Sequence, residues 1–309
     1  MMASFLALGE CMVEIAPAEG GLCRQGFAGD TFNAAWYARR ALPAAWSVDL
    51  ATQVGRDAVS DAMLGFMADE GIGTASILRR DDRTVGLYLI SLANGERSFS
   101  YWRGQSAARM LAEDPAWLAG VLADRRVIRF SGITLAILPP EGRQALCAAL
   151  AQARAGGALV SFDTNLRPRL WDSADAMRAG LTLGASVADV VPPSFDEETG
   201  LFGDPTPKAT AARYGAGGAR VVAVKNGGDP LTLWTPEGVA QVDPVPVAQV
   251  VDTTAAGDSF AGMVLAGLAC GHPLADAARG AMQVAARVIR ARGALVPGAV
   301  DQRWADQTR

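Results

Sequence analysis

The sequence predicts an α/β fold built on a mostly parallel β-sheet, for three reasons. Half of the 309 residues are hydrophobic and 19% are charged, which gives one globular chain an ample core and argues against fibrous and disordered classes. Short runs of Val, Ile and Leu alternate with alanine-rich amphipathic segments, a rhythm typical of parallel sheets covered by helices. One segment departs from that rhythm and is typical of an antiparallel hairpin.

The predicted elements follow in chain order. Apolar runs bounded by turn residues predict strands at 5–9, 48–52, 127–131, 158–163, 187–191 and 220–225. Apolar residues at helical spacing predict helices at 31–42, 57–70, 140–155, 207–214, 255–269 and 274–291. Strands and helices therefore alternate along most of the chain.

The hairpin is predicted from two extended runs, 84–91 and 96–103, which flank Asn94-Gly95, a strong signal for a two-residue turn. With these two residues at the turn, the numbers of cross-strand partners sum to about 189. That register sets Tyr88 opposite Tyr101 and places both on one face with Arg103.

The other face of the hairpin carries Leu87, Leu89 and Trp102. A hairpin outside the main sheet would need to bury this apolar face, so we expect a lid over a substrate site with its back against another subunit. Two alternatives stay open: the aromatic side chains simply pack the hairpin, or a slip of one residue exchanges the two faces.

Charge and cysteine usage exclude several classes of protein. The net charge is −4 and Lys and Arg do not cluster, which argues against a nucleic-acid or anionic-membrane partner and favours a small molecule. The four cysteines are scattered without a Cys-x-x-Cys pair, and no apolar stretch is long enough to span a bilayer. We therefore expect a cytoplasmic protein with reduced thiols.

Histidine and lysine usage narrows the chemistry. His272 is the only histidine, so a Ser-His-Asp triad or a histidine-rich metal site is not expected. The only lysines, Lys208 and Lys225, do not follow glycine, so the Gly-Lys-Ser/Thr phosphate loop is absent. Nucleotide phosphates must be held another way.

The segment 252–262 offers that way. Small residues at Ala255, Ala256 and Gly257 precede an apolar helix, whose first N–H groups lack intrahelical partners and can bind an anion. Asp258 lies in the first turn, where it can accept a proton from a hydroxyl. This pattern suits phosphoryl transfer to an alcohol, although an ordinary helix start with an acidic first turn has the same sequence.

Two motifs and the hairpin together resemble the ribokinase-like (PfkB) family of carbohydrate kinases. Residues 252–262 resemble the family's Ala-Gly-Asp signature, and residues 29–35 (Gly-Asp-Thr-Phe-Asn-Ala-Ala) resemble its sugar-binding motif. The resemblance implies a three-layer ribokinase-like sandwich over 1–309, with a small β-sheet lid formed by about 13–26 and 84–103. It also implies ATP and Mg²⁺ as cofactors, with a monovalent cation such as K⁺ as a further expectation.

Within the family, four segments resemble the 2-keto-3-deoxygluconate kinase group: 9–14, 27–33, 101–103 and 163–168. The chemistry agrees, because an aldonic acid carries a carboxylate and guanidinium groups bind carboxylates in a fixed geometry. Arg103 on the hairpin and Arg167 after the strand at 158–163 would converge on it. The alternative is that either arginine is a surface charge.

The resemblance also implies a set of site residues. Asp258 is the expected catalytic base, with Ala255, Ala256 and Gly257 as the anion hole. The expected substrate-binding residues are Gly29, Asp30, Asn33, Tyr88, Tyr101, Arg103, Arg167 and Asp258 itself. The expected nucleotide-binding residues are Lys225, Gly227, Gly228, Asp252, Thr253 and Gly257, with Lys225 alternatively a strand-end charge. Glu197 is the expected indirect metal contact, in an acidic motif that departs from the family's pattern because Ser194 stands where many members have asparagine.

The expected reaction is phosphorylation of the terminal hydroxyl of 2-keto-3-deoxygluconate by a homodimer or larger homo-oligomer. A kinase for fructose, ribose or 5-keto-gluconate is the alternative, because the Gly-Asp motif is common to all of them. A catalytically silent sugar-binding regulator is a further alternative, which the intact Asp258 motif argues against. No residue type distinguishes the gluconate from the galactonate form of the acid.

Overall fold

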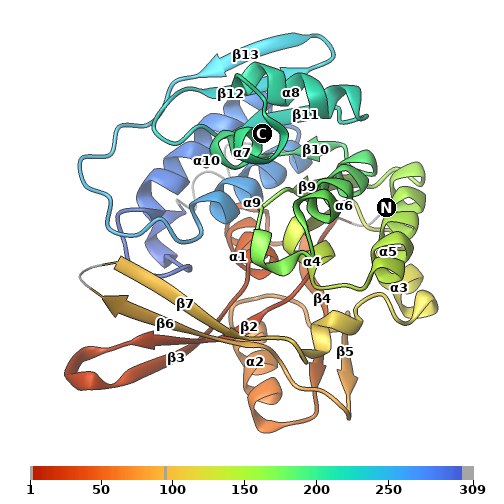
Figure 1. Cartoon of the computed structure of the whole chain (residues 1–309), viewed down its shortest axis with the longest axis vertical. Helices are drawn as coiled ribbons and strands as arrows, with labels where there is room; N and C mark the ends of the chain where they lie inside the picture. Colours follow the sequence, from red (N-terminus) through yellow and green to blue (C-terminus); the bar gives the residue numbers. More distant parts are fainter. Residues whose placement is uncertain (1–2, 94–95, 301–309) are drawn as a thin grey trace.

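The computed structural model describes residues 3–93 and 96–300, which form two β-sheets (Figure 1). The large sheet has nine strands, whose order is β13-β12-β11-β10-β9-β8-β1-β4-β5. All neighbours from β11 to β5 pair in parallel, and β12 and β13 are antiparallel additions at one edge. The strands are β1 (Ser4–Leu8), β4 (Ser47–Gly55), β5 (Ile77–Arg80), β8 (Val127–Ser131), β9 (Leu159–Asp163), β10 (Val190–Val191), β11 (Val221–Val224), β12 (Leu231–Thr235) and β13 (Gly238–Val242).

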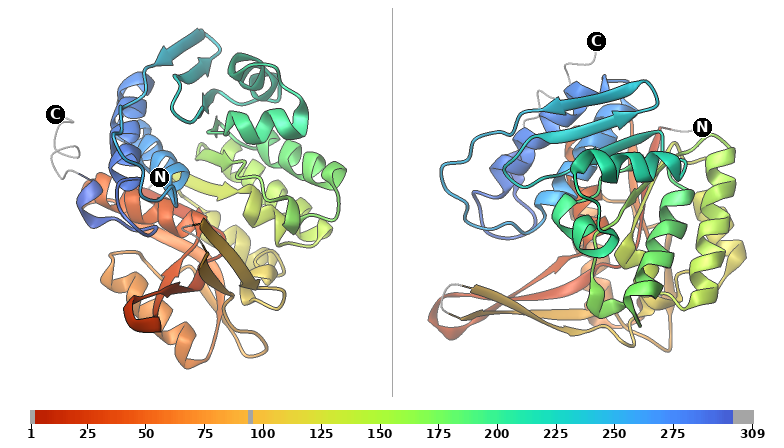
Figure 2. Two further views of the ribbon diagram at one scale, coloured as in Figure 1. Left: turned by 60° about the vertical axis from the view of Figure 1, so that its left-hand side comes forward. Right: turned by 45° about the horizontal axis from the view of Figure 1, so that its top comes forward.

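Helices cover both faces of the large sheet, which confirms the predicted three-layer architecture (Figure 2). One layer contains α1 (Asp30–Ala41), α2 (Ala58–Asp69), α9 (Ala256–Ala269) and α10 (Leu274–Val288). The other contains α3 (Pro115–Leu122), α4 (Gly132–Ala136), α5 (Pro140–Ala155), α6 (Ala174–Ser186), α7 (Phe195–Phe202) and α8 (Pro207–Ala216).

Strand β1 shows how the sequence divides the core between these layers. Phe5 and Ala7 belong to the hydrophobic cluster under α1, α9 and α10, whereas Leu6 and Leu8 belong to the cluster under α5 and α6. Successive side chains of a strand point to opposite faces, so a strand buried on both sides is a continuous apolar run. This is why the parallel strands could be found in the sequence without alternation.

Most predicted elements lie within two residues of the observed ones. The predicted helix at 274–291 is too long, because α10 ends at Val288, and the predicted strand at 187–191 shortens to Val190–Val191. Among the described residues, no helix is both long and apolar enough to cross a membrane.

A second, four-stranded sheet projects from the large domain, at the lower left of Figure 1. It contains β3 (Cys23–Ala28), β2 (Met12–Pro17), β6 (Leu87–Ala93) and β7 (Glu96–Trp102) in that order, with β2 and β6 parallel. Tyr88 pairs with Tyr101 across β6 and β7, so the predicted hairpin register is confirmed. The predicted Asn94-Gly95 turn itself lies outside the described residues.

The two faces of the small sheet have different surroundings. Met12, Tyr88 and Ile90 on the inner face pack against Ala294 in the segment that follows α10. On the outer face, the ring of Phe27 contacts Phe66 of α2 at 5.5 Å between centroids. The outer face also carries Trp102, which is 60% exposed, so α2 covers only part of it.

Candidate active site

The candidate site lies where α9 begins, beside the carboxyl ends of the parallel strands (Figure 1). Ala255 caps the helix in the left-handed region (φ 60°), which costs a non-glycine residue roughly 1–2 kcal/mol. The predicted helix start is thus correct to one residue. Strained residues that persist are concentrated at functional sites, and this turn aims the first N–H groups of α9 out of the helix.

Asp252 organises this turn. One carboxylate oxygen accepts hydrogen bonds from the backbone N–H and the hydroxyl of Thr254, and the other accepts one from the N–H of Gly293 at 2.8 Å. The side chain is buried, so its contribution to nucleotide binding would be through the shape of the turn. Thr253, in contrast, is exposed.

Asp258 lies in the first turn of α9 with its carboxylate facing α1. The Nδ2 of Asn33 donates a hydrogen bond to its Oδ2 at 2.8 Å. Burial, and then the neighbouring carboxylate of Asp30, raise the pKa of Asp258 to about 7, although the charge of Arg129 lowers it. A carboxyl group with a pKa near neutrality is well matched to accept a proton from an alcohol at physiological pH.

The Gly-Asp-Thr-Phe-Asn motif at the start of α1 supplies the second half of the site. Asn33 accepts a hydrogen bond from the N–H of Gly29 while its amide holds Asp258. Asp30 accepts a hydrogen bond from Nδ2 of Asn165 at 2.9 Å. Gly29 is needed for space, because a Cβ there would lie 2.1 Å from the backbone oxygen of Glu10.

The tyrosines of the small sheet share the inner face, as predicted. The hydroxyl of the buried Tyr88 donates a hydrogen bond to Oε2 of Glu14, and burial followed by the Glu14 charge raises the pKa of Tyr88 well above its ordinary value. The ring of Tyr101 lies 6.0 Å from that of Tyr88 but is 49% exposed. Tyr101 is therefore the one of the pair with free surface for a ligand.

Arg103 forms a buried ion pair that the sequence did not predict. Its Nη2 donates a hydrogen bond to Oε2 of Glu10, and both side chains are less than 10% exposed. Gly86 makes room for the pair, because a Cβ there would lie 2.8 Å from Oε1 of Glu10. Arg103 lies on the predicted face, but part of its guanidinium is committed to a carboxylate of the protein.

Arg167 and Glu197, which were predicted separately for substrate and metal, lie together. Nη1 of Arg167 is 3.1 Å from Oε1 of Glu197, and the other carboxylate oxygen accepts a hydrogen bond from the N–H of Leu166. The side chain of Arg167 is 47% exposed, so an incoming anion can reach it.

The predicted nucleotide loop follows β11. Gly227 has a φ of 56°, which favours glycine, and a Cβ at Gly227 or Gly228 would meet no atom within 4 Å. The backbone here is open to a ligand. Nζ of Lys225 lies 3.6 Å from Oδ1 of Asp163 and close to Gly257, at 3.2 Å from the place a Cβ would occupy. Lys225 thus joins the loop to the start of α9.

Residues for a magnesium ion are few. Within 3–93 and 96–300 there is no cluster of three or more His, Cys, Asp or Glu side chains that could hold a metal ion. A site with one partly exposed carboxylate, such as that of Glu197, fits an ion that is bound largely through phosphate oxygens and water.

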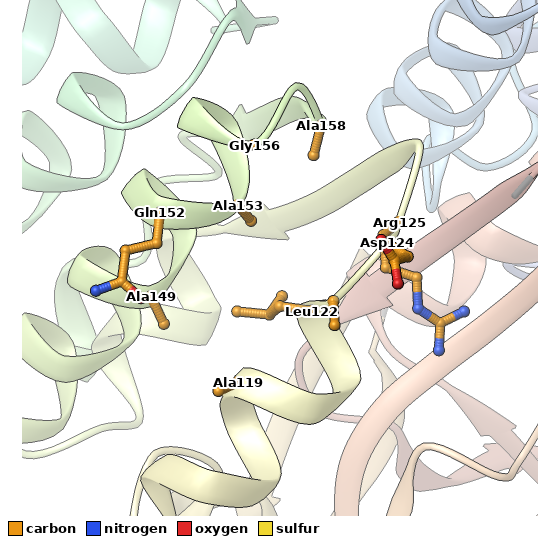
Figure 3. Close-up of a pocket in the computed structure, with 10 residues that line it drawn as sticks. Ala119, Leu122, Asp124, Arg125, Ala149, Gln152, Ala153, Gly156 and Ala158 are labelled. Atoms are coloured by element: carbon orange, nitrogen blue, oxygen red, sulfur yellow. The ribbon is translucent and has the colours of Figure 1, made fainter. Parts of the chain in front are cut away.

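A hollow of about 260 Å³ lies between α3 and α5, away from the site around Asp258 (Figure 3). It is lined by Ala119, Leu122, Ala149 and Ala153, with Asp124 and Arg125 at the side that leads into β8. These residues lie at the amino ends of the strands, opposite the site built around Asp258. Arg125 is also bonded to Asp49 and Ser76, which leaves the hollow without convergent polar groups.

Several site residues were missed in the sequence. Glu10, Glu14 and Asn165 each bind a predicted residue, and Asn165 has an unusual φ of 33°. The available signal was a polar residue within an apolar strand or no more than two residues after its end. Arg129 inside β8 and Asp163 at the end of β9 share that signal, because charged residues are rarely buried without a reason.

The chain is similar to known proteins over nearly its whole length. Residues 2–299 match the model of the pfkB family of carbohydrate kinases. The chain is 37% identical over 304 residues to a 2-dehydro-3-deoxygluconokinase of Escherichia coli (strain K12), covering 96% of this chain and 98% of the relative. It is 38% identical over 298 residues to the enzyme of the same name from Dickeya dadantii, covering 94% and 96%. A crystal structure of fructokinase with bound ATP from Xylella fastidiosa superposes with a TM-score of 0.81 at 26% identity, over 95% of this chain and 94% of that one.

Proposed function

Because the chain belongs to the pfkB family of carbohydrate kinases, we propose that it transfers the γ-phosphoryl group of ATP to the terminal hydroxyl of 2-keto-3-deoxygluconate. The product would be 2-keto-3-deoxy-6-phosphogluconate. The relatives named for this reaction match the chain over nearly its whole length. The observation that carries the proposal is the Asp258 carboxyl held by Asn33 at the open end of α9.

The chemistry follows from this arrangement. The hydroxyl oxygen forms a bond to the γ-phosphorus, the bond from that phosphorus to the bridging oxygen breaks, and ADP leaves. Asp258 accepts the hydroxyl proton. In the expected anion hole, the N–H of Ala256 already donates to the backbone oxygen of Thr253, so we assign the N–H groups of Gly257 and Asp258 to stabilise charge on the moving phosphoryl group. Mg²⁺, when bound with ATP, neutralises phosphate charge, and Glu197 is the acidic side chain assigned to support it.

Recognition of the sugar acid is assigned to the residues around Asp258. Asp30 and Asn33 would bind hydroxyl groups, and Tyr101 would lie against the sugar from the small sheet, which acts as a lid. Arg167 is the better placed of the two arginines for the carboxylate, because it is the more exposed. Arg103 would contribute through the part of its guanidinium group that does not bind Glu10.

A coupled ADP-release assay across sugars tests the substrate. We expect the keto-deoxy acid to be used with a far higher kcat/KM than fructose, ribose or 5-keto-gluconate. Replacing Arg167 with methionine should reduce kcat/KM for the acid by roughly 10- to 100-fold, the cost of one charged hydrogen bond, and leave kcat/KM for neutral sugars unchanged. Ribose or fructose outperforming the acid would contradict the proposal.

The same assay tests the proposed monovalent cation. Replacing KCl with choline chloride should lower the rate of ADP release if the protein uses K⁺.

We also propose that the protein is a homodimer or larger homo-oligomer in the cytoplasm. The outer face of the small sheet leaves Trp102 60% exposed and carries the partly buried Leu87 and Leu89. A second copy would cover this face. Light scattering at micromolar concentration should give at least twice the chain's 32.1 kDa, and Trp102→Glu should shift the mass toward a monomer. A monomeric mass for the unaltered protein would contradict the proposed oligomer.

The proposed cytoplasmic location has separate support. All four cysteines are free thiols, in keeping with a reducing compartment.

A further inference from the structure

A buried arginine lies beneath the site and has no evident structural purpose. Arg129 is in the middle of β8, its side chain is fully buried, and its Nη2 donates a hydrogen bond to Oδ2 of Asp163 at 2.9 Å. Its Nε and Nη1 have no hydrogen-bond partner in the described part of the chain. Well-packed apolar residues in place of a buried ion pair are often neutral or stabilising, so stability alone does not account for this one.

The pair points toward the site. Arg129 lies opposite Ser161 in the register of β8 and β9, and Ser131 lies opposite Asp163. Their neighbours Phe130 and Phe162 pack into the core under α5 and α6. Because side chains alternate along a strand, Arg129 and Asp163 face the other layer, which contains α1 and α9.

A lysine connects the pair to the first turn of α9. Oδ1 of Asp163, the oxygen that Arg129 does not bind, is 3.6 Å from Nζ of Lys225. That ammonium group lies so close to Gly257 that a Cβ there would be 3.2 Å from it. The charges also reach the catalytic carboxyl, since Arg129 lowers and Asp163 raises the pKa of Asp258.

We propose that Arg129 and Asp163 are positioning residues, which hold the ammonium group of Lys225 at the first turn of α9, where it binds the phosphoryl group during transfer. This rests on the proposed kinase function, adds two residues to it, and gives the already expected Lys225 a defined role. Arg129 fixes one oxygen of Asp163, and the other oxygen restrains a lysine that has four rotatable bonds and a partly exposed side chain. A preorganised cation stabilises charge that develops in the transition state and therefore acts on kcat.

The test is a double-mutant cycle in the ADP-release assay, at saturating ATP and Mg²⁺, using the best substrate of the wild type. Lys225→Met should lower kcat by roughly 10²- to 10³-fold, the usual effect of removing one transition-state donor, with KM for the sugar little changed. Asp163→Asn should lower kcat by at least about 10-fold alone, and by less than about twofold when Lys225 is already methionine. Such coupling would support the proposal.

Asp189→Asn is the matched control. Asp189 is also a buried aspartate paired with an arginine, Arg154, at 2.9 Å, but it lies at the amino end of β10. Its kcat should equal that of the wild type. Equal losses in the two aspartate variants would overturn the proposal, because they would report general destabilisation.

Two further outcomes would overturn it. The first is a full additional loss from Asp163→Asn in the Lys225→Met background, especially with a raised Mg²⁺ requirement, because Asp163 would then act without the lysine. The second is an unchanged kcat in Lys225→Met, which tests the proposal even if Asp163→Asn does not fold. Neither outcome affects the proposed function, which depends on the wild type's choice of substrate.

Discussion

Asp258→Asn is expected to lower kcat by roughly 10²- to 10⁴-fold, the usual contribution of a general base. The asparagine keeps the size of the side chain. Its amide oxygen can still accept the hydrogen bond that Asn33 donates to Oδ2 of Asp258 in the wild type. Affinity for the sugar acid should therefore change little. Steady-state kinetics give kcat, and calorimetric titration gives the affinity. An asparagine variant that kept most of its turnover would rule out Asp258 as the base.

The carboxyl group of Asp258 should also make kcat/KM depend on pH. Burial and the charge of Asp30 raise the pKa of Asp258 to about 7, so a large fraction is protonated below that pH and cannot accept a proton. We expect kcat/KM to rise with pH and to level off above about 7 to 8.

Stability should respond in the opposite sense. The pKa of Asp258 is higher in the folded protein than the ordinary value of 3.8, so between these values the folded state binds a proton that the unfolded state releases. The stabilisation from this proton is complete below about pH 4 and is lost as the pH rises through 7. Asp258→Asn removes the titration, so its melting temperature should exceed that of the wild type by more at pH 8 than at pH 5. The exposed Asp69→Asn is the control, which should show no such trend.

The fold could be predicted because its signals are local. The parallel strands are continuous apolar runs, and α5 begins with Pro140 and ends before Gly156-Gly157, so both limits were found. The helices α3, α4, α6 and α7 were missed. In α6 the two glycines, Gly180 and Gly184, weaken the helical pattern. Glycine is required at both positions by side chains that lie outside the helix. A Cβ at Gly180 would lie 2.2 Å from Trp171, and one at Gly184 would lie 2.6 Å from Phe162.

The site was predicted in part, for a similar reason. Asp258 and Asn33 are in motifs with their own chemistry, and the structure brings them within 2.8 Å across 225 residues. The residue that pairs with an arginine, in contrast, need not lie near it in the sequence. Arg103 follows β7 and Glu10 precedes β2, and the two meet because β6 pairs with both of these strands. Arg167 meets Glu197 because the loop after β9 lies beside the start of α7. Nothing local in the sequence specifies such pairs.

Arg103→Met should destabilise the protein by about 3–5 kcal/mol, because it leaves the carboxylate of Glu10 buried without its cation. Chemical denaturation measures this loss. Arg178→Met is the matched control: its ion pair with Asp175 is solvent-exposed, and such pairs contribute about 0–1 kcal/mol. A loss as small as that of the control would mean that the Glu10–Arg103 pair is not formed in solution.

The double variant Glu10→Leu/Arg103→Met separates the stability of this pair from its role in binding. With both charges removed, most of the lost stability should return, since apolar replacements of a buried pair are often neutral. KM for the keto-deoxy acid should nevertheless stay raised if Arg103 also attracts the substrate carboxylate. A double variant with wild-type stability and wild-type KM would make Arg103 purely structural and leave Arg167 as the carboxylate contact. The position of Arg103, beside Tyr101 on β7 but bonded to Glu10, leads us to expect the raised KM.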